Sequence, residues 1–302
     1  MDQQKNYLVF QCYGNEGIFH ECAYALLSLT RIYKGTLPPD TEVWIYTDNA
    51  AWFQAFNGVT LPLHFAHIDK DKITRWRGTI DFVHRVKIEM LKDFTRDKQG
   101  NVLYADTDVV FNRCLDDIFQ AVAAGTLYMH VMEGIVSSRS NPIFAKLDSY
   151  LRENTPMQVN GKPLWDLAMW NAGVLGFNTS CRYLLDDVLT FTDTEYPKFP
   201  KHIVEQFAFS VFFRQAGVVK TAAPCILHYW NLKEVRSLLA SFFTHFRART
   251  WSELAVWSDL IQMPVLMQEK VNFLHNRDIT DKLLKKNWQP PEYNWNEMIT
   301  QL

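Results

Sequence analysis

The sequence has no long apolar run and no cysteine pair with metal-binding spacing. No apolar segment approaches the roughly 20 residues that a transmembrane helix requires, and residues 1–6 lead into an apolar strand without the pattern of a signal peptide. The 5 cysteines are odd in number and scattered, which argues against a zinc site and against a disulfide framework. These absences predict a soluble cytoplasmic protein with free thiols, at most peripheral to the inner face of a membrane.

A strong charge of either sign is also missing. The formal net charge is −2, which argues against a nucleic-acid binder that relies on a general positive field. Hydrophobic residues make up 48% of the 302 positions and charged residues 21%, so the chain can bury a large core. This length suits one large α/β domain, alone or with a helical annex.

The stretch of residues 101–111 (NVLYADTDVVF) places two carboxylates at the end of an apolar strand. Asp106 and Asp108 follow the run 102–105 with only Thr107 between them. Like charges this close repel each other and lose solvation, and a divalent cation would satisfy both. In open α/β sheets, ligands bind outside the carboxyl ends of the strands. The alternative is a solvated turn, in which an aspartate caps the helix that starts near Leu115.

Three α/β units precede Asp106. Apolar runs at 7–10, 42–48 and 61–68 predict strands, and Pro62 favours an edge position or a late start for the third strand. Helical spacing is found at 20–33, 52–56 and 79–94, the last with Val83 on its apolar stripe. This order predicts a mixed, mainly parallel sheet of the nucleotide-binding type.

The second half of the chain becomes more helical. Strands are expected at 127–131, 174–177 and 225–228, and helices at 115–123, 143–152, 181–191 and 204–214. Residues 136–142 read as a loop, and everything beyond Lys233 reads as helix and loop. We therefore predict one domain over residues 1–236, with 237–302 as a helical extension packed on it.

Several further residues could carry chemistry. The small, polar run 171–173 precedes a buried strand, where a bulky ligand could lie against Gly173 and accept a hydrogen bond from Asn171; an ordinary strand-entry turn is the alternative. His228 ends a strand and Lys233 follows, which would suit an imidazole metal ligand and a cation for an anionic oxygen, although a lone histidine is more often structural. For Arg85 and Lys87 the alternative is ordinary surface ion pairing, since Arg85 lies one helical turn from Asp81 and Glu89.

Taken in order, these segments resemble the glycosyltransferases of family 8, which have the GT-A fold and include glycogenin and bacterial lipopolysaccharide sugar transferases. Residues 103–110 followed by 115–119 are similar to the Asp-x-Asp region of that family. Four more blocks match the family in sequence order. Residues 81–87 resemble its helix that carries an Arg near the diphosphate, and residues 170–178 resemble its Phe-Asn-Ala-Gly-Val block. Residues 205–206 resemble its Asp-Gln pair, and residues 226–229 resemble the segment with its metal-binding His. The resemblance covers roughly residues 7–236, and several ordered blocks are a stronger signal than Asp-x-Asp alone.

The resemblance implies transfer of a sugar from a nucleotide-diphosphate donor to a hydroxyl of a glycan, lipid-linked or small-molecule acceptor. The habit of this family implies that the anomeric configuration is retained. It implies that Asp106, Asp108 and His228 hold Mn²⁺ or Mg²⁺, which neutralises the departing diphosphate. The other implied residues are Cys12, Tyr13 and Asp48 for the nucleoside, Arg85, Lys87, Thr107 and Lys233 for the diphosphate, Gly173 beside the sugar, and Asn171, Glu205 and Gln206 as the catalytic set. The run from His228 to Lys233 is one residue tighter than in the family.

Two other functions stay open. In a phosphohydrolase of the haloacid dehalogenase type, Asp106 would be the nucleophile and Asp108 a general acid. That type needs a later acidic pair, for which Asp186 and Asp187 are the nearest option, inside a helical pattern. A catalytically silent nucleotide-sugar or glycan-binding protein could have the same fold and metal site.

The aromatic residues near the C-terminus have two interpretations. The phenylalanines of the segment 236–249, close to Arg247 and Arg249, could dock on a membrane, or could belong to a helix that covers the sheet edge. The later tryptophans could be acceptor platforms, but packing anchors are the expected role. The residues concerned are Phe242, Phe243, Phe246, Trp251, Trp257, Trp288 and Trp295.

Overall fold

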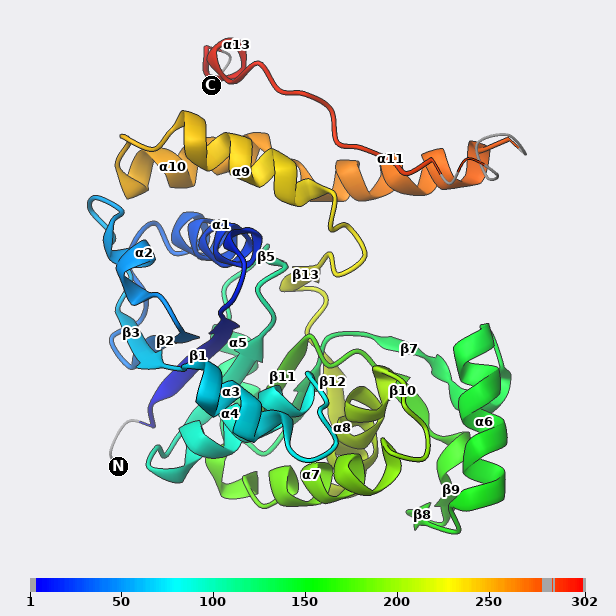
Figure 1. Cartoon of the computed structure of the whole chain (residues 1–302). Coiled ribbons are helices and arrows are strands. Elements are labelled where there is room, and N and C mark those ends of the chain that lie inside the picture. Colours follow the sequence, from blue (N-terminus) through cyan, green and yellow to red (C-terminus); the bar gives the residue numbers. More distant parts are fainter. Residues whose placement is uncertain (1–3, 279–283, 285, 301–302) are drawn as a thin grey trace.

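The structure, a computed structural model of the chain, describes residues 4–278, 284 and 286–300. Its centre is a 7-stranded sheet with the strand order β12-β6-β11-β4-β1-β2-β3 (Figure 1). Strands β1 (Asn6–Cys12), β2 (Thr41–Thr47), β3 (Leu63–His67) and β4 (Asn101–Ala105) are parallel. Strand β11 (Val174–Asn178) runs antiparallel to β4 and to β6 (Leu127–Met129), and β12 (Val219–Thr221) is parallel to β6. The predicted mixed, mainly parallel sheet is confirmed, with β3 at its edge.

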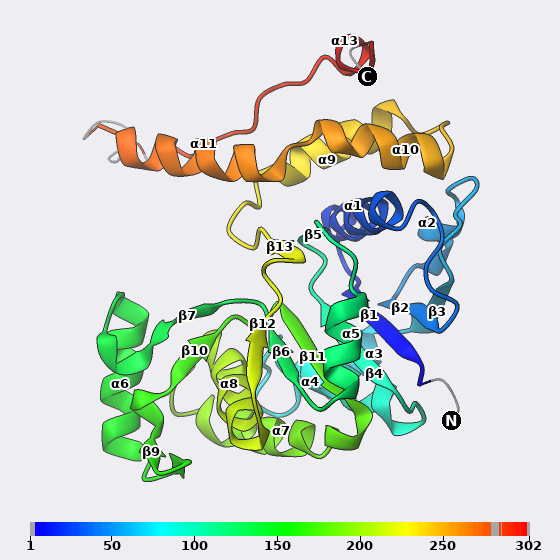
Figure 2. The same ribbon diagram turned by 180° about the vertical axis from the view of Figure 1, so that it is seen from behind.

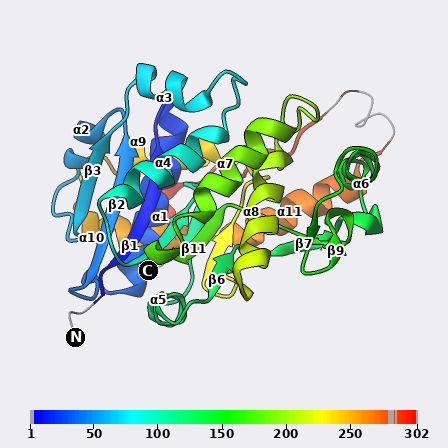
Figure 3. The same cartoon turned by 90° about the horizontal axis from the view of Figure 1, so that it is seen from below.

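Helices cover both faces of the sheet because the strands are apolar on both sides. Leu8 and Phe10 of β1 belong to one hydrophobic cluster, whereas Tyr7 and Val9 belong to the other. The first cluster includes α1 (Glu16–Ile32), α2 (Ala50–Gln54) and α5 (Asp116–Ala123). The second includes α4 (Arg85–Arg96), α7 (Leu184–Glu195) and α8 (Ile203–Ala216), which lie across the sheet in Figure 3.

The C-terminal helices form a further layer over α1, seen from both sides in Figures 1 and 2. They are α9 (Val235–His245), α10 (Trp251–Trp257), α11 (Met263–Asn276) and α13 (Trp295–Ile299). Phe242, Phe243 and Phe246 are buried in the cluster that contains α1, so these side chains are not available to a membrane. They pack on a helix and not on the sheet edge, which corrects both interpretations. Trp251, Trp288 and Trp295 are buried packing residues, as expected, and Trp257 packs against the same cluster.

The helix predicted over 79–94 is wrong in its first part. Helix α4 begins at Arg85, residues 79–84 form a turn, and an unpredicted helix α3 (Lys70–Arg77) precedes them. Gly78 and Asp81 both have positive φ values, +66° and +50°, which a continuous right-handed helix does not allow. Val83 is consequently 48% exposed and does not belong to the apolar stripe.

A side arm extends from the second half of the sheet. Its helix is α6 (Pro142–Asn154), and its ribbon pairs β7 (Met132–Ile135) with β10 (Ala168–Trp170). The arm also contains β8 (Gln158–Val159), β9 (Lys162–Pro163) and short 3₁₀ turns at Val136–Ser138 and Leu164–Asp166. Other 3₁₀ turns lie at Thr179–Cys181 and Ser258–Leu260.

Within the described residues, no helix has both the length and the apolar character needed to cross a bilayer.

Candidate active site

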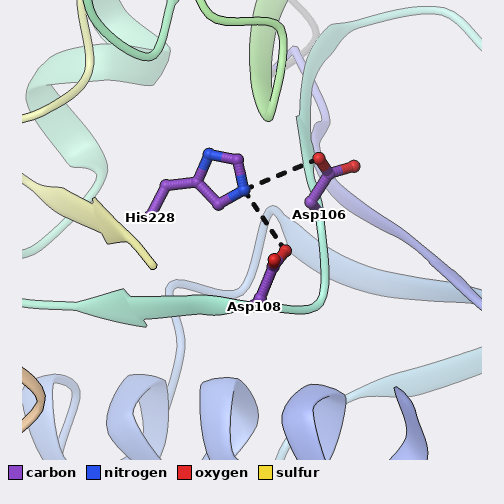
Figure 4. Close-up of side chains that lie close together, drawn as sticks. All are labelled: Asp106, Asp108 and His228. Atoms are coloured by element: carbon purple, nitrogen blue, oxygen red, sulfur yellow. Dashed lines mark hydrogen bonds and ion pairs between the residues drawn. The ribbon is translucent and has the colours of Figure 1, made fainter. Parts of the chain in front are cut away.

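The ends of three strands bring the predicted metal ligands together. Asp106 and Asp108 lie between β4 and β5 (Val109–Phe111), and β13 (Ile226–His228) pairs antiparallel with β5, so that His228 lies opposite Val109. His228 Nε2 lies 3.2 Å from Asp108 Oδ1 and 3.7 Å from Asp106 Oδ2 (Figure 4). One potential ligand atom from each residue lies within 4.8 Å of the others. Two carboxylates and an imidazole in this arrangement are a suitable ligand set for a divalent cation.

Gly173 makes this arrangement possible. Its carbonyl oxygen accepts a hydrogen bond from the Asp106 amide at 2.8 Å, which fixes the backbone beside the carboxylates. A Cβ atom on Gly173 would lie 2.1 Å from His228 Cε1 and 2.3 Å from its Nδ1. A small residue was predicted here for the close approach of a ligand. The structure shows that the imidazole of His228 already requires it.

Asn171 orients the ring of His228. The Asn171 Oδ1 atom lies 3.0 Å from His228 Nδ1 and accepts from the Gly173 amide at 2.9 Å. The Asn171 Nδ2 group donates to Glu133 Oε1 at 3.0 Å. An amide oxygen can only accept, so this assignment of the amide places the hydrogen on Nδ1 of His228. The other nitrogen, Nε2, faces the carboxylates, where it can donate to Asp108 or, without its hydrogen, bind a metal.

Asp108 is buried, and each of its carboxylate oxygens has its own partner. Oδ1 contacts His228, whereas Oδ2 accepts from Lys233 Nζ at 2.5 Å. Burial alone would raise the pKa of Asp108, but hydrogen bonds and charges from His228 and Lys233 lower it well below its usual range. Asp108 is therefore ionised at neutral pH. These contacts exclude the solvated-turn alternative for Asp108, and the amide of Leu115, the N-cap residue of α5, donates to the Tyr33 hydroxyl and not to an aspartate.

The sequence-based prediction missed a second buried carboxylate behind Lys233. Glu21 on α1 is 0% exposed, accepts two hydrogen bonds of 2.9 Å from Arg236, and lies 3.7 Å from Lys233 Nζ. Lys233 thus lies between Asp108 and Glu21. No local signal marks Glu21, because it stands within an otherwise apolar helical face that the sequence presents as core.

Lys87 is a buried cation that joins Asp106 to Glu205. Its Nζ donates to the Ala172 carbonyl at 3.0 Å and lies 3.2 Å from Glu205 Oε1 and 3.6 Å from Asp106 Oδ1. The surface-pair alternative is therefore wrong for Lys87. Burial raises the pKa of Glu205 to about 7, and Lys87 only partly opposes this shift. Burial opposes the charge on Lys87 too, but Asp106 and Glu205 together raise its pKa. Burial outweighs the neighbouring charge at Glu205 but not at Lys87, because Lys87 faces two carboxylates whereas Glu205 faces one cation.

The structure does not bring Arg85 into the cluster. Its guanidinium donates to Asp193 at 2.7 and 3.1 Å, to the Trp76 carbonyl at 2.7 Å, and pairs with Glu89 at 2.9 Å. Pairing with Glu89 was the alternative interpretation. The expected partner Asp81 instead pairs with Arg77 at 2.7 Å.

The predicted nucleoside residues lie at the carboxyl ends of β1 and β2, at the same edge of the sheet as Asp106. Cys12 is buried, and its thiol donates to the Ile18 carbonyl at 3.8 Å. Asp48 accepts from the Gly14 amide at 3.2 Å, and Tyr13 accepts from Gln11 at 3.4 Å. Thr107 is buried between the two aspartates.

Comparison with known proteins gives a fold but no sequence family. No family model matches the chain, and no curated protein sequence matches it. In three dimensions it is similar to the bifunctional glycosyltransferase WbbM, with 13% identity over 72% of this chain and 39% of that chain and a TM-score of 0.50. A second match is the galactosyltransferase LgtC, solved with donor and acceptor sugar analogs, with 14% identity over 80% of this chain and 99% of that chain and a TM-score of 0.49. A third is the glycosyltransferase GlyE of Streptococcus pneumoniae, with 15% identity over 84% of this chain and 62% of that chain and a TM-score of 0.48. The fold is thus one found in GT-A glycosyltransferases, the class that the sequence motifs resemble.

Proposed function

We propose that this protein is a metal-dependent glycosyltransferase that moves a sugar from a nucleotide-diphosphate donor to an acceptor hydroxyl. The observation that carries the proposal is the cluster of Asp106, Asp108 and His228 at the carboxyl edge of a sheet with a glycosyltransferase fold. Asp108 is ionised and His228 presents Nε2, so the donor set fits Mn²⁺ or Mg²⁺. A metal held there would neutralise the charge that develops on a departing diphosphate.

The two lysines beside the metal-binding cluster, Lys233 and Lys87, have different roles. Lys233 has a side chain that is 48% exposed, so its ammonium can reach a bound diphosphate as well as Asp108. The Lys87 side chain is only 7% exposed and is held by Glu205 and the Ala172 carbonyl, so it positions Asp106 and does not reach a ligand. Glu205 is itself 2% exposed, and we assign it the task of holding Lys87.

The donor sugar would lie beside Asn171 and Gln206. Gln206 Nε2 donates to Glu133 Oε2 at 2.8 Å at an exposed position, and Asn171 lies between Glu133 and His228. Gln206 is thus the carboxamide placed to contact sugar hydroxyls near the metal, while the buried Asn171 supports it through Glu133. Retention of the anomeric configuration is part of the proposal, and the NMR coupling constant of the product's anomeric proton tests it.

Neither alternative function is favoured by a specific contact. For a phosphohydrolase, Asp106 would have to be a free nucleophile, yet it accepts a hydrogen bond from the Tyr104 hydroxyl and lies beside Lys87. Asp186 lies on α7 and pairs with Lys92 at 2.6 Å, so it does not supply the later acidic pair. A silent binding protein would bind a donor at the same site without releasing diphosphate.

The deciding experiment is release of nucleoside diphosphate from a panel of nucleotide sugars, with Mn²⁺ and with a chelator. We expect one donor to be turned over only with metal, and Asp108→Asn to abolish turnover. Asp187→Asn, on the exposed face of α7, is the matched control. Turnover that survives chelation or Asp108→Asn would refute the metal role. Thermal stabilisation by a donor without turnover would indicate the binding protein, and hydrolysis of a simple phosphate monoester the phosphohydrolase.

A further inference from the structure

Strand β7 has one residue more than the strand it pairs with. Gly134 pairs with Met169 and Met132 with Trp170, which leaves Glu133 without a partner on β10. An extra residue of this kind is a β-bulge, and bulges beside active sites often redirect a side chain. Gly134 next to it has a φ of +136°, a conformation that favours glycine. The backbone is therefore locally irregular at Glu133, whose carboxylate bonds to two residues of the candidate site.

The Glu133 carboxylate binds two of the predicted catalytic residues at once. Oε1 accepts from Asn171 at 3.0 Å, and Oε2 accepts from Gln206 at 2.8 Å. A carboxylate can only accept, so both side-chain amides must turn their NH₂ groups toward Glu133. Within the part of the chain that the structure describes, the only other side-chain hydrogen bond of Gln206 is a long one of 3.5 Å, in which the Ala172 amide donates to its Oε1. No cation among the described residues pairs with Glu133, which is otherwise exposed to solvent, so these two amides are its side-chain partners.

We propose that Glu133 is a positioning residue, which holds Asn171 and Gln206 in place and, through Asn171, aims the ring of His228 at the metal. The inference rests on the proposed function, because only there is His228 a metal ligand. The Gly173 amide also binds Asn171 Oδ1 at 2.9 Å, so the loss of Glu133 should loosen Asn171 without reversing its amide. Outer partners of metal ligands typically change metal affinity by about 10- to 100-fold. For Glu133→Ala we expect the lower end of that range.

The first test is a double-mutant cycle on Mn²⁺ affinity, measured by titration calorimetry without any sugar. Glu133→Ala should bind Mn²⁺ roughly 10-fold more weakly than the native chain. In an Asn171→Ala background it should have no further effect, because the connection to His228 is already broken. Met132→Ala, at the exposed neighbour on the same strand, is the control and should leave the affinity unchanged. Unaltered affinity in Glu133→Ala, or an equal loss in both backgrounds, would overturn the proposal.

The second test needs neither metal nor turnover, so it separates failure of this inference from failure of the proposed function. The side-chain amide NMR signals of Asn171 and Gln206, assigned from the two alanine variants, should both shift in Glu133→Ala. They should stay in place in Met132→Ala. If both signals keep their native shifts in Glu133→Ala, Glu133 does not position these residues, even in a chain that binds no Mn²⁺.

Discussion

Lys233 Nζ lies 2.5 Å from Asp108 Oδ2, while His228 Nε2 lies 3.2 Å from the other oxygen of the same carboxylate. The Lys233 ammonium therefore binds one of the two oxygens of the carboxylate that is proposed to bind the metal. The contact joins a residue that follows β13 to the turn after β4. From this position the Lys233 ammonium could leave Asp108 and bind a diphosphate instead.

We expect Lys233→Met to lower kcat/KM for the nucleotide sugar by about 10- to 100-fold, the size of one charge-assisted hydrogen bond. Mn²⁺ affinity should not fall, because the variant removes a cation that competes for Asp108. Steady-state kinetics and calorimetry check the two parts. Lys146→Met on the exposed side of α6 is the control. A variant with native kcat/KM would exclude Lys233 from the diphosphate site.

Gly173→Ala should disrupt the metal cluster by steric conflict. Its Cβ would lie 2.1 Å from His228 Cε1, so the ring must move away from Asp106 and Asp108. We expect a loss of about 1–3 kcal/mol in the free energy of unfolding, together with weaker Mn²⁺ binding. Gly217→Ala is the matched control, since nothing lies within 4 Å of its added Cβ and its φ of 174° is open to any residue. Urea unfolding and calorimetry measure both effects, and native Mn²⁺ affinity in Gly173→Ala would contradict the structure.

Stability should depend on pH through Glu205. Its pKa is raised from 4.5 to about 7, so between these values the folded chain binds a proton that the unfolded chain has released. The free energy of unfolding should therefore fall as the pH rises through this window, by roughly 3 kcal/mol relative to Glu205→Gln, and level off above it. Lys87 keeps Asp106 and the Ala172 carbonyl as partners in the variant. Urea unfolding of both metal-free proteins from pH 4.5 to 8 tests this, with exposed Glu153→Gln as control. Parallel profiles for Glu205→Gln and the native chain would contradict it.

Arg85 distinguishes a structural role from a diphosphate-binding role. Its ion pairs with Asp193 and Glu89 tie α4 to α7, and its side chain is only 11% exposed. We expect Arg85→Met to lower the free energy of unfolding by about 2 kcal/mol and to leave KM for the donor unchanged. A raised KM at native stability would instead support the sequence-based prediction that Arg85 lies near the diphosphate.

The parts of the fold that sequence predicted correctly depend on local patterns. Each of these patterns lies within a short stretch of the sequence, as do the apolar runs of β1 and β4 and the helical stripe of α1. No distant residue is needed to recognise them. The boundary of α4 was wrong because the apolar spacing continues through Val83, while positive φ at Gly78 and Asp81 breaks the helix. Strand β7 was missed because most of its residues are exposed, and its bulge interrupts the alternation that marks a strand.

By itself, the sequence determined the strands of the sheet other than β12, the main helices on its faces and the pair of carboxylates at the end of β4, because these follow from spacing over a few residues. Only the tertiary structure decided which partners those carboxylates have. Asp108 and His228 are 120 positions apart, and Lys233 and Asp108 are 125 apart. Arg85 and Lys87 differ by two positions, yet one is bound to surface carboxylates and the other is buried beside Asp106. The side to which a side chain points is set by packing between distant elements, and no local pattern records it.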